Sequence, residues 1–181
     1  YQNMKKVYVT NDTKYLYVAV EFAETPGGNK TNINLSFTTG ADNGSASDDS
    51  GWMTPATTTT FSNGTLDFKA YENIAWIAND ATNQRGLSNL SASGVCGPTW
   101  NAEANGYTND SKIIEYSIKL SDLSVSLGDK VKLFASISQY SYSSENHETL
   151  LDCIPSAAAS VTDSGETVSV DFSKALEYTI Q

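Results

Sequence analysis

Two tryptophans placed among loop-forming residues are the most suggestive chemical feature of this sequence. Trp52 follows Asp-Asp-Ser-Gly, and Trp100 lies in Gly-Pro-Thr-Trp-Asn, so neither belongs to an alternating apolar pattern. An indole ring stacks on the apolar face of a pyranose, while nearby amides and carboxylates bind the hydroxyls. These residues predict a site for a neutral sugar. The alternative is that each Trp covers a small core beneath its own loop.

A third tryptophan, Trp76, follows a stretch whose alternation is ambiguous. Along 65–78, one face would carry Leu66, Phe68 and Ala70 and then continue to Glu72 and Trp76. Burying an unpaired Glu72 is costly, and a bulge near Tyr71 would expose it instead. Trp76 is therefore predicted either as core or as site. The predicted carbohydrate contacts are Trp100, Trp52, Trp76, Tyr140, Tyr142, Asp49 and Gln139.

An oxygen-rich segment suggests a possible structural calcium ion. Asp42, Asn43, Asp48 and Asp49 lie close together in the chain, and calcium takes six to eight oxygen ligands. The spacing is not that of an EF-hand. Asp42 and Asp48 are the predicted metal ligands, with a solvated loop or a sugar-binding loop as the alternatives. No other cofactor is predicted.

Nothing in the sequence marks a catalytic centre. His147 is the only histidine, and no Gly-x-Ser-x-Gly nucleophile turn accompanies it. No pair of carboxylates is singled out for glycoside hydrolysis, and zinc, phosphate-loop and dinucleotide patterns are missing from the sequence. The prediction is a protein without enzymatic activity and without catalytic residues.

Composition narrows the range of partners. The net charge of −10 disfavours nucleic acid and anionic membrane surfaces. Ser, Thr and Asn supply 57 of the 181 residues, a surface that suits neutral polar ligands and exported proteins. No stretch approaches the roughly 20 apolar residues of a membrane helix. The chain begins at Tyr1 and is interpreted as a module of a larger extracellular or cell-surface protein.

Strong alternation predicts an all-β fold. Ile114, Tyr116, Ile118 and Leu120 share one face of a strand, with polar residues on the other. A sheet with one wet face is antiparallel, and two such sheets pack as a sandwich. We predict an antiparallel β-sandwich, a single domain over 1–181. Its strands are expected near 5–10, 14–23, 31–39, 65–78, 86–92, 112–120, 130–140, 167–172 and 175–180.

Three long loops, 40–64, 93–111 and 140–166, are expected between these strands, and Thr57 to Thr60 belongs to a loop or an edge strand. If strand direction alternates, all three loops emerge at one end of the sandwich. That end would carry both cysteines, Cys96 and Cys153, together with Trp52, Trp100, Tyr140, Tyr142 and His147. We expect these two to form a disulfide, with a pair of buried free thiols as the alternative.

Three segments together resemble a known group of modules. They are Tyr15-Leu-Tyr-Val-Ala-Val-Glu, Glu115-Tyr-Ser-Ile-Lys-Leu-Ser-Asp-Leu and Asp152-Cys-Ile-Pro-Ser. The chain is similar to DOMON-like and family-9-like carbohydrate-binding sandwiches, and within them to starch-binding modules of the cell-surface complexes of gut ruminococci. Leu120 stands where the family pattern has a proline, and Lys119 precedes it. The resemblance implies aromatic stacking plus polar contacts, often with a structural calcium ion.

The expected function is therefore non-catalytic binding of a neutral polysaccharide or oligosaccharide, with α-glucans such as starch and maltooligosaccharides as the expected ligands. Ring stacking on Trp100, helped by Trp52 or Trp76, would supply the main contact. The rival interpretation is a protein-interaction or adhesin module of the cohesin-like type. A flat apolar patch on a sheet face would favour that rival.

Overall fold

The computed structural model describes residues 3–24, 31–40, 44–49, 54–73, 85–89, 112–142 and 146–181. These residues form β-strands joined by turns and by three short 3-10 helices. None of the helices in this part of the chain is long and apolar enough to cross a membrane. The strands are β1 (Met4–Asn11), β2 (Tyr15–Phe22), β3 (Thr31–Thr38), β4 (Ser47–Asp48), β5 (Thr58–Ser62), β6 (Phe68–Asn73), β7 (Arg85–Asn89), β8 (Ile113–Lys119), β9 (Lys130–Tyr142), β10 (Asn146–Ile154), β11 (Ala159–Thr162), β12 (Thr167–Asp171) and β13 (Leu176–Thr179). The 3-10 helices are η1 (Ser156–Ala158), η2 (Asp163–Gly165) and η3 (Phe172–Lys174).

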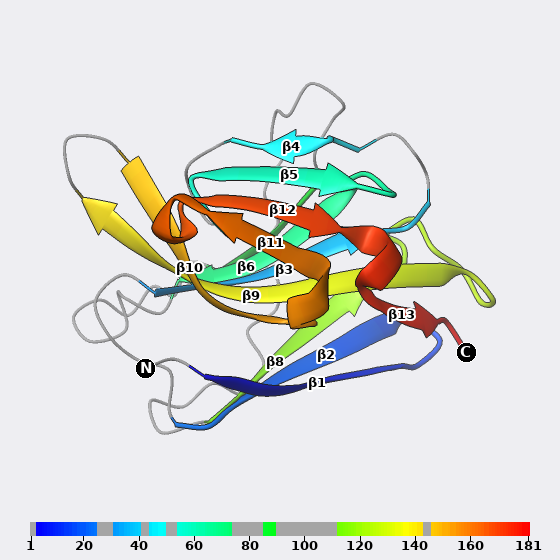
Figure 1. The fold of residues 1–181 in the computed structure, drawn as a ribbon. Coiled ribbons are helices and arrows are strands. Elements are labelled where there is room, and N and C mark those ends of the chain that lie inside the picture. The colour runs from blue at the N-terminus through cyan, green and yellow to red at the C-terminus, as the bar shows by residue number, and fades with distance from the viewer. Residues whose placement is uncertain are drawn as a thin grey trace.

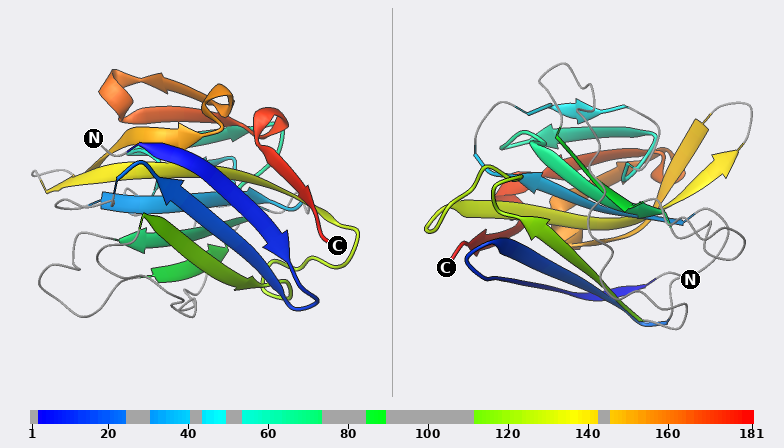
Figure 2. Two further views of the ribbon diagram at one scale, coloured as in Figure 1. Left: turned by 90° about the horizontal axis from the view of Figure 1, so that it is seen from below. Right: turned by 180° about the vertical axis from the view of Figure 1, so that it is seen from behind.

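The strands build three stacked layers (Figure 1). One outer sheet has the order β1-β2-β8, and the central sheet has the order β10-β9-β3-β6-β7, with β13 also pairing with β9. The other outer sheet has the order β11-β12-β5-β4. The views from below and from behind show the same stacking (Figure 2). The all-β, sandwich-like prediction is confirmed, with a third layer that it did not include.

The larger core lies between the β1-β2-β8 sheet and the central sheet. Alternation creates it directly: Leu16, Val18 and Val20 of β2 are buried, as are Ile33 and Leu35 of β3. Each such side chain contributes roughly 1.5–3 kcal/mol when it leaves water. Because this core packs against one face of the β1-β2-β8 sheet, the other face of that sheet points outward.

The second face of the central sheet is polar and buried, which corrects the expectation of a wet face there. Asn32, Asn34 and Ser36 of β3 are at most 1% exposed, because the β11-β12-β5-β4 sheet and the segment 54–57 cover them. A smaller apolar cluster fills part of the same interface, where Phe61 stacks on Phe172 with ring centres 5.5 Å apart. All eight residues of β3 are consequently buried.

Glu148 of β10 organises much of this polar interface. One carboxylate oxygen, Oε1, accepts a hydrogen bond from Asn32 Nδ2 at 2.9 Å. The other, Oε2, accepts from the Thr54 backbone N–H and from Ser138 Oγ, each at 3.0 Å. A buried carboxylate is tolerated only with such donors. Glu148 thereby ties the segment 54–57 to the central sheet.

Two of the expected long loops contain regular structure. The range 40–64 includes β4 and β5, and the range 140–166 includes β10, β11 and two 3-10 helices. The expectation that both are rim loops was therefore wrong. β5, which includes Thr58 to Thr60, lies between β12 and β4 and pairs with β12 in parallel. It is neither a loop nor an edge strand, and the fold is not purely antiparallel.

The pairing of β6 settles one ambiguity of the sequence. Its ladder with β3 runs without a register shift from Phe68, opposite Phe37, to Glu72, opposite Ile33. The bulge considered near Tyr71 is therefore not formed, and Tyr71 is 5% exposed, on the polar side of the central sheet.

Candidate functional site

The outward face of the β1-β2-β8 sheet carries the candidate site. Strand register arranges its side chains in rows that run across the three strands. In one row Tyr8, Ala19 and Glu115 stand side by side, and in the next stand Thr10, Tyr17 and Ser117. The small Ala19 thus lies between two long side chains, because opposite positions in a sheet are only about 5 Å apart. The face is hollow at its centre.

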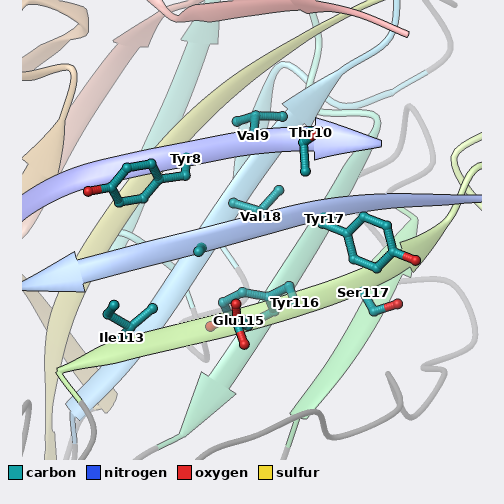
Figure 3. A pocket seen from close by; sticks show the side chains of 10 residues that line it. Tyr8, Val9, Thr10, Tyr17, Val18, Ile113, Glu115, Tyr116 and Ser117 are labelled. Carbon is teal, nitrogen blue, oxygen red and sulfur yellow. The ribbon is translucent and has the colours of Figure 1, made fainter. Parts of the chain in front are cut away.

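Two tyrosines of this face, Tyr8 and Tyr17, are held by carboxylates. Tyr8 Oη donates to Glu21 Oε2 at 2.7 Å, and Tyr17 Oη donates to Asp12 Oδ2 at 2.8 Å. Glu21 and Asp12 lie on opposite sides of the Ala19 row, so the two rings lean away from each other (Figure 3). The rings stay accessible, with Tyr8 48% and Tyr17 37% exposed.

Each carboxylate is anchored in turn. Asp12 Oδ1 accepts the backbone N–H groups of Lys14 and Tyr15 at 2.7 and 2.8 Å, which closes the turn between β1 and β2. Glu21 Oε1 accepts from Lys5 Nζ at 3.1 Å. Tyr17 also contacts Tyr15, with ring centroids 6.1 Å apart. The aromatic rings therefore have defined orientations before any ligand arrives.

These hydrogen bonds shift the acidities of the groups involved. The Lys14 backbone N–H and the Tyr17 phenol lower the pKa of Asp12, and the Tyr8 phenol followed by Lys5 lowers the pKa of Glu21. Conversely, the Glu21 carboxylate raises the pKa of Tyr8, and Asp12 raises the pKa of Tyr17. At neutral pH the pairs exist as carboxylate and neutral phenol.

The hollow between these side chains has a volume of about 740 Å³, within the usual range of small-molecule sites. Its wall is mainly apolar, and hydroxyl and carboxylate oxygens stand along it. Hollows also lie near Thr39 and near Leu127. The first has no aromatic lining residue and the second only Tyr15, so the β1-β2-β8 face is the stronger candidate.

The arrangement offers stacking surfaces and hydrogen-bonding oxygens, which suits binding. Within the described part of the chain, no three His, Cys, Asp or Glu side chains gather to hold a metal ion. Each phenol proton of Tyr8 and Tyr17 is already donated to a carboxylate, so these oxygens remain acceptors for a ligand. A ligand that fits would present both an apolar face and hydroxyl groups.

Most of the aromatic residues predicted for the site lie where the structure gives no account of them. Trp52, Trp76 and Trp100 fall outside the described residues, and so does Asp42. Tyr140 and Tyr142 lie on β9 near its hairpin with β10. Their predicted contacts with sugar stay predictions.

Two polar residues predicted for the site lie away from the hollow, one just after β4 and one on β9. Asp49 is exposed just after β4, where it accepts from Ser47 Oγ at 3.3 Å. Gln139 is exposed on β9, opposite Thr31 of β3 and Thr149 of β10. Neither residue lines the hollow at Ala19.

The predicted calcium ligand Asp48 has a different partner in the structure. Its Oδ2 accepts from Lys69 Nζ at 2.8 Å, and the two side chains are 0% and 4% exposed. The ammonium already supplies a positive charge at this carboxylate. The pairing therefore gives no support to Asp48 as a calcium ligand, because a second cation beside Lys69 would be repelled.

Cys153 is a free thiol, so no disulfide is formed at this residue. It lies on β10 opposite Ser136 and packs into the smaller core beside Phe134, not in a rim loop as expected. Burial, helped by Asp152, raises its pKa to about 11. The predicted partner, Cys96, falls outside the described residues.

The tyrosine face was missed by reasoning from sequence, although a signal for it exists. Tyr8 and Tyr17 occupy the outward, polar positions of strands whose inward positions are Val7, Val9, Leu16 and Val18. An aromatic residue at an outward position of an alternating strand has no core to fill. Two such residues on neighbouring strands therefore indicate an exposed aromatic surface.

Comparison with known proteins returned no matching family model, no matching curated protein and no matching solved structure. The resemblance to DOMON-like sandwiches thus stays a prediction. The geometry of the β1-β2-β8 face is therefore the main pointer to what this chain binds.

Proposed function

We propose that this chain is a non-catalytic carbohydrate-binding module whose ligand occupies the hollow on the β1-β2-β8 face. The observation that carries the proposal is the pair of exposed tyrosines, Tyr8 and Tyr17, fixed by carboxylates around the hollow at Ala19. Aromatic rings provide stacking surface for the apolar face of a sugar, and fixed rings lose little freedom on binding. Acceptor oxygens around them bind the sugar hydroxyls.

An α-glucan, such as starch or a maltooligosaccharide, is the proposed ligand. The few contacts available on one face support weak binding per module. Useful retention on a polysaccharide would come from several modules acting together in a larger extracellular or cell-surface protein. The acidic, hydroxyl-rich composition suits that setting.

The rival function is protein interaction, and the exposed Ile113, 42% accessible, is the observation that favours it. A flat apolar sheet face would suit a protein partner. This face is instead hollowed at Ala19, and its aromatic hydroxyls are engaged by Glu21 and Asp12. Those features favour a small polar ligand as the partner of this face, rather than a protein with a flat surface.

The decisive experiment is binding to insoluble starch and to cellulose, followed by calorimetry with maltooligosaccharides. Each stacked ring contributes about 1–3 kcal/mol by analogy with base stacking, so Tyr8→Ala and Tyr17→Ala should each weaken binding about ten- to hundredfold. Val161→Ala, on the exposed face of β11, is the matched control and should bind like the parent protein.

The outcomes separate the candidate surfaces. If both tyrosine variants bind normally and Trp100→Ala does not, the sugar site lies at the predicted tryptophan loops. If no polysaccharide or oligosaccharide is retained by the parent protein, the carbohydrate proposal is wrong. Reducing ends should not accumulate on long incubation with starch, because no catalytic pair is proposed.

A further inference from the structure

The separation of the two tyrosine rings limits what can bind across them. Tyr8 and Tyr17 occupy diagonal positions on β1 and β2, since Tyr17 pairs with Thr10. Such positions are about 7–8 Å apart at the backbone. Each ring then leans further outward, toward Glu21 on one side and Asp12 on the other. A single pyranose ring therefore cannot stack on both.

Ala19 creates the space between the rings. It stands opposite Tyr8 on β1 and Glu115 on β8, and its side chain is a single methyl group. Val18 and Tyr116 also line the hollow, but their side chains are each 1% exposed and belong to the core beneath the sheet. A longer outward side chain at this position would fill it. The middle of the face is thus a floor at the Ala19 methyl group, flanked by two aromatic platforms.

We infer that the face takes a continuous stretch of at least three sugar units of one glycan chain. One unit stacks on Tyr8, the next lies over Ala19 within reach of the Glu115 and Thr10 oxygens, and the third stacks on Tyr17. This inference rests on the proposed carbohydrate-binding function. It adds that Ala19 determines ligand length, so that monosaccharides and disaccharides are poor ligands.

The length dependence follows from the number of platforms that a ligand reaches. A monosaccharide or disaccharide contacts one tyrosine and the floor. A trisaccharide gains the second stacking contact without a second loss of overall translational freedom, because its units are covalently joined. One further ring contact corresponds to about a tenfold or larger gain in affinity. Beyond about four units, the affinity should level off.

The test is calorimetry of the whole chain with glucose, maltose, maltotriose, maltotetraose and maltohexaose. The parent protein should bind maltotriose at least tenfold more tightly than maltose, with less than about a threefold further gain from maltotetraose to maltohexaose. Ala19→Leu should remove that step, because the longer side chain fills the space over which the middle sugar unit lies. Ala157→Leu, at an exposed position of η1, is the matched control and should keep the step.

A second variant guards against a folding defect at position 19. Tyr17→Ala removes one platform at an exposed site and should also abolish the gain between maltose and maltotriose. Equal affinities for glucose and maltotriose in the parent protein would overturn the inference, and so would an unchanged length series in Ala19→Leu. Both results leave the carbohydrate proposal standing, whereas failure of every sugar and of starch to bind would end the proposal itself.

Discussion

At the scale of single residues, the phenol–carboxylate pairs determine how the binding face responds to pH. In both pairs the shared proton stays on the phenol, because the tyrosine pKa is raised and the carboxyl pKa is lowered. The ordinary pKa values are 4.5 for Glu and 10.0 for Tyr. Each hydrogen bond therefore persists from below the ordinary pKa of its carboxyl group to above the ordinary pKa of its phenol.

Sugar affinity should be constant between about pH 5 and pH 9. A carboxylate with a lowered folded-state pKa keeps its contribution above the ordinary value and loses it only as pH falls through the lowered value. The raised phenol pKa moves the alkaline loss above the ordinary tyrosine value in the same way. Calorimetry across this range tests the expectation, with Glu21→Gln as the comparison, since that variant keeps a weaker acceptor.

A tenfold change in affinity centred near pH 6 or 7 would contradict this expectation and would point to another titrating group at the site. Spectroscopic titration gives a second check. Tyrosinate absorbance from Tyr8 and Tyr17 should appear only above the ordinary tyrosine range, and their replacement by Phe should remove that late component.

At the scale of elements, the buried Lys69–Asp48 ion pair connects an edge strand of one sheet to the central sheet. Asp48 belongs to β4, which has only two residues, and Lys69 belongs to β6. Their side chains are almost completely buried, so neither charge is solvated by bulk water. The outer sheet is thus attached at this point through charge more than through apolar contact.

Removing one member of the pair should be more harmful than removing both. Asp48→Ala leaves a buried ammonium and should lower the free energy of unfolding by about 3–5 kcal/mol. The double change Asp48→Ala with Lys69→Met should recover part of that loss. Chemical denaturation of the single and double variants measures it, with the exposed pair Lys130–Glu177 as control, expected below about 1 kcal/mol. Additive losses at Asp48 and Lys69 would contradict the prediction.

The elements also show which parts of the fold could be predicted. Strands such as β2 and β8 were predicted because their inward residues, Leu16 to Phe22 and Ile114 to Ile118, alternate strictly against an apolar core. β10 was missed because its alternation is interrupted by a register shift between Leu150 and Asp152. β5 was predicted only as part of a loop or an edge strand, because three consecutive threonines give no contrast between its faces.

The third layer could not be foreseen for a related reason. Asn34 and Ser36 alternate with apolar residues, which normally indicates a solvated face, but here they meet another sheet and the Thr54 segment. Polar residues indicate hydrogen bonding, whether to water or to protein, and one sequence does not separate the two. The site face was missed because Tyr8 and Tyr17, as outward residues of alternating strands, give the same period-two pattern as any polar residue, whereas a loop tryptophan stands outside every pattern.

At the scale of the whole molecule, the two interfaces between layers differ in chemistry. The interface beneath the β1-β2-β8 sheet is filled by the larger apolar cluster. The interface beneath the β11-β12-β5-β4 sheet combines the smaller cluster with buried groups such as Asn32, Ser138 and Glu148. Apolar area supplies most of the favourable energy of folding, so the second interface holds its sheet less firmly.

Native-state hydrogen exchange should therefore detect two levels of protection. Backbone amides of β5 and β12 should exchange through a partial opening, while those of β3 and β9 should exchange only with global unfolding. Val168→Ala should accelerate exchange in β5 and β12 and leave β2 and β8 nearly unchanged. Uniform exchange in all three sheets would show that the layers unfold as one unit.

The parallel pairing of β5 with β12 has a consequence for how the protein is made. Thr60 and Ser169 face each other although 109 residues separate them in the chain. A ribosome needs roughly 5–20 s to synthesise such a length. During that time β5 has no β12 beside it, and an unpaired strand edge invites association with other chains. The threonines of β5 make this strand polar while it is unpaired, which lowers the risk of aggregation before β12 leaves the ribosome.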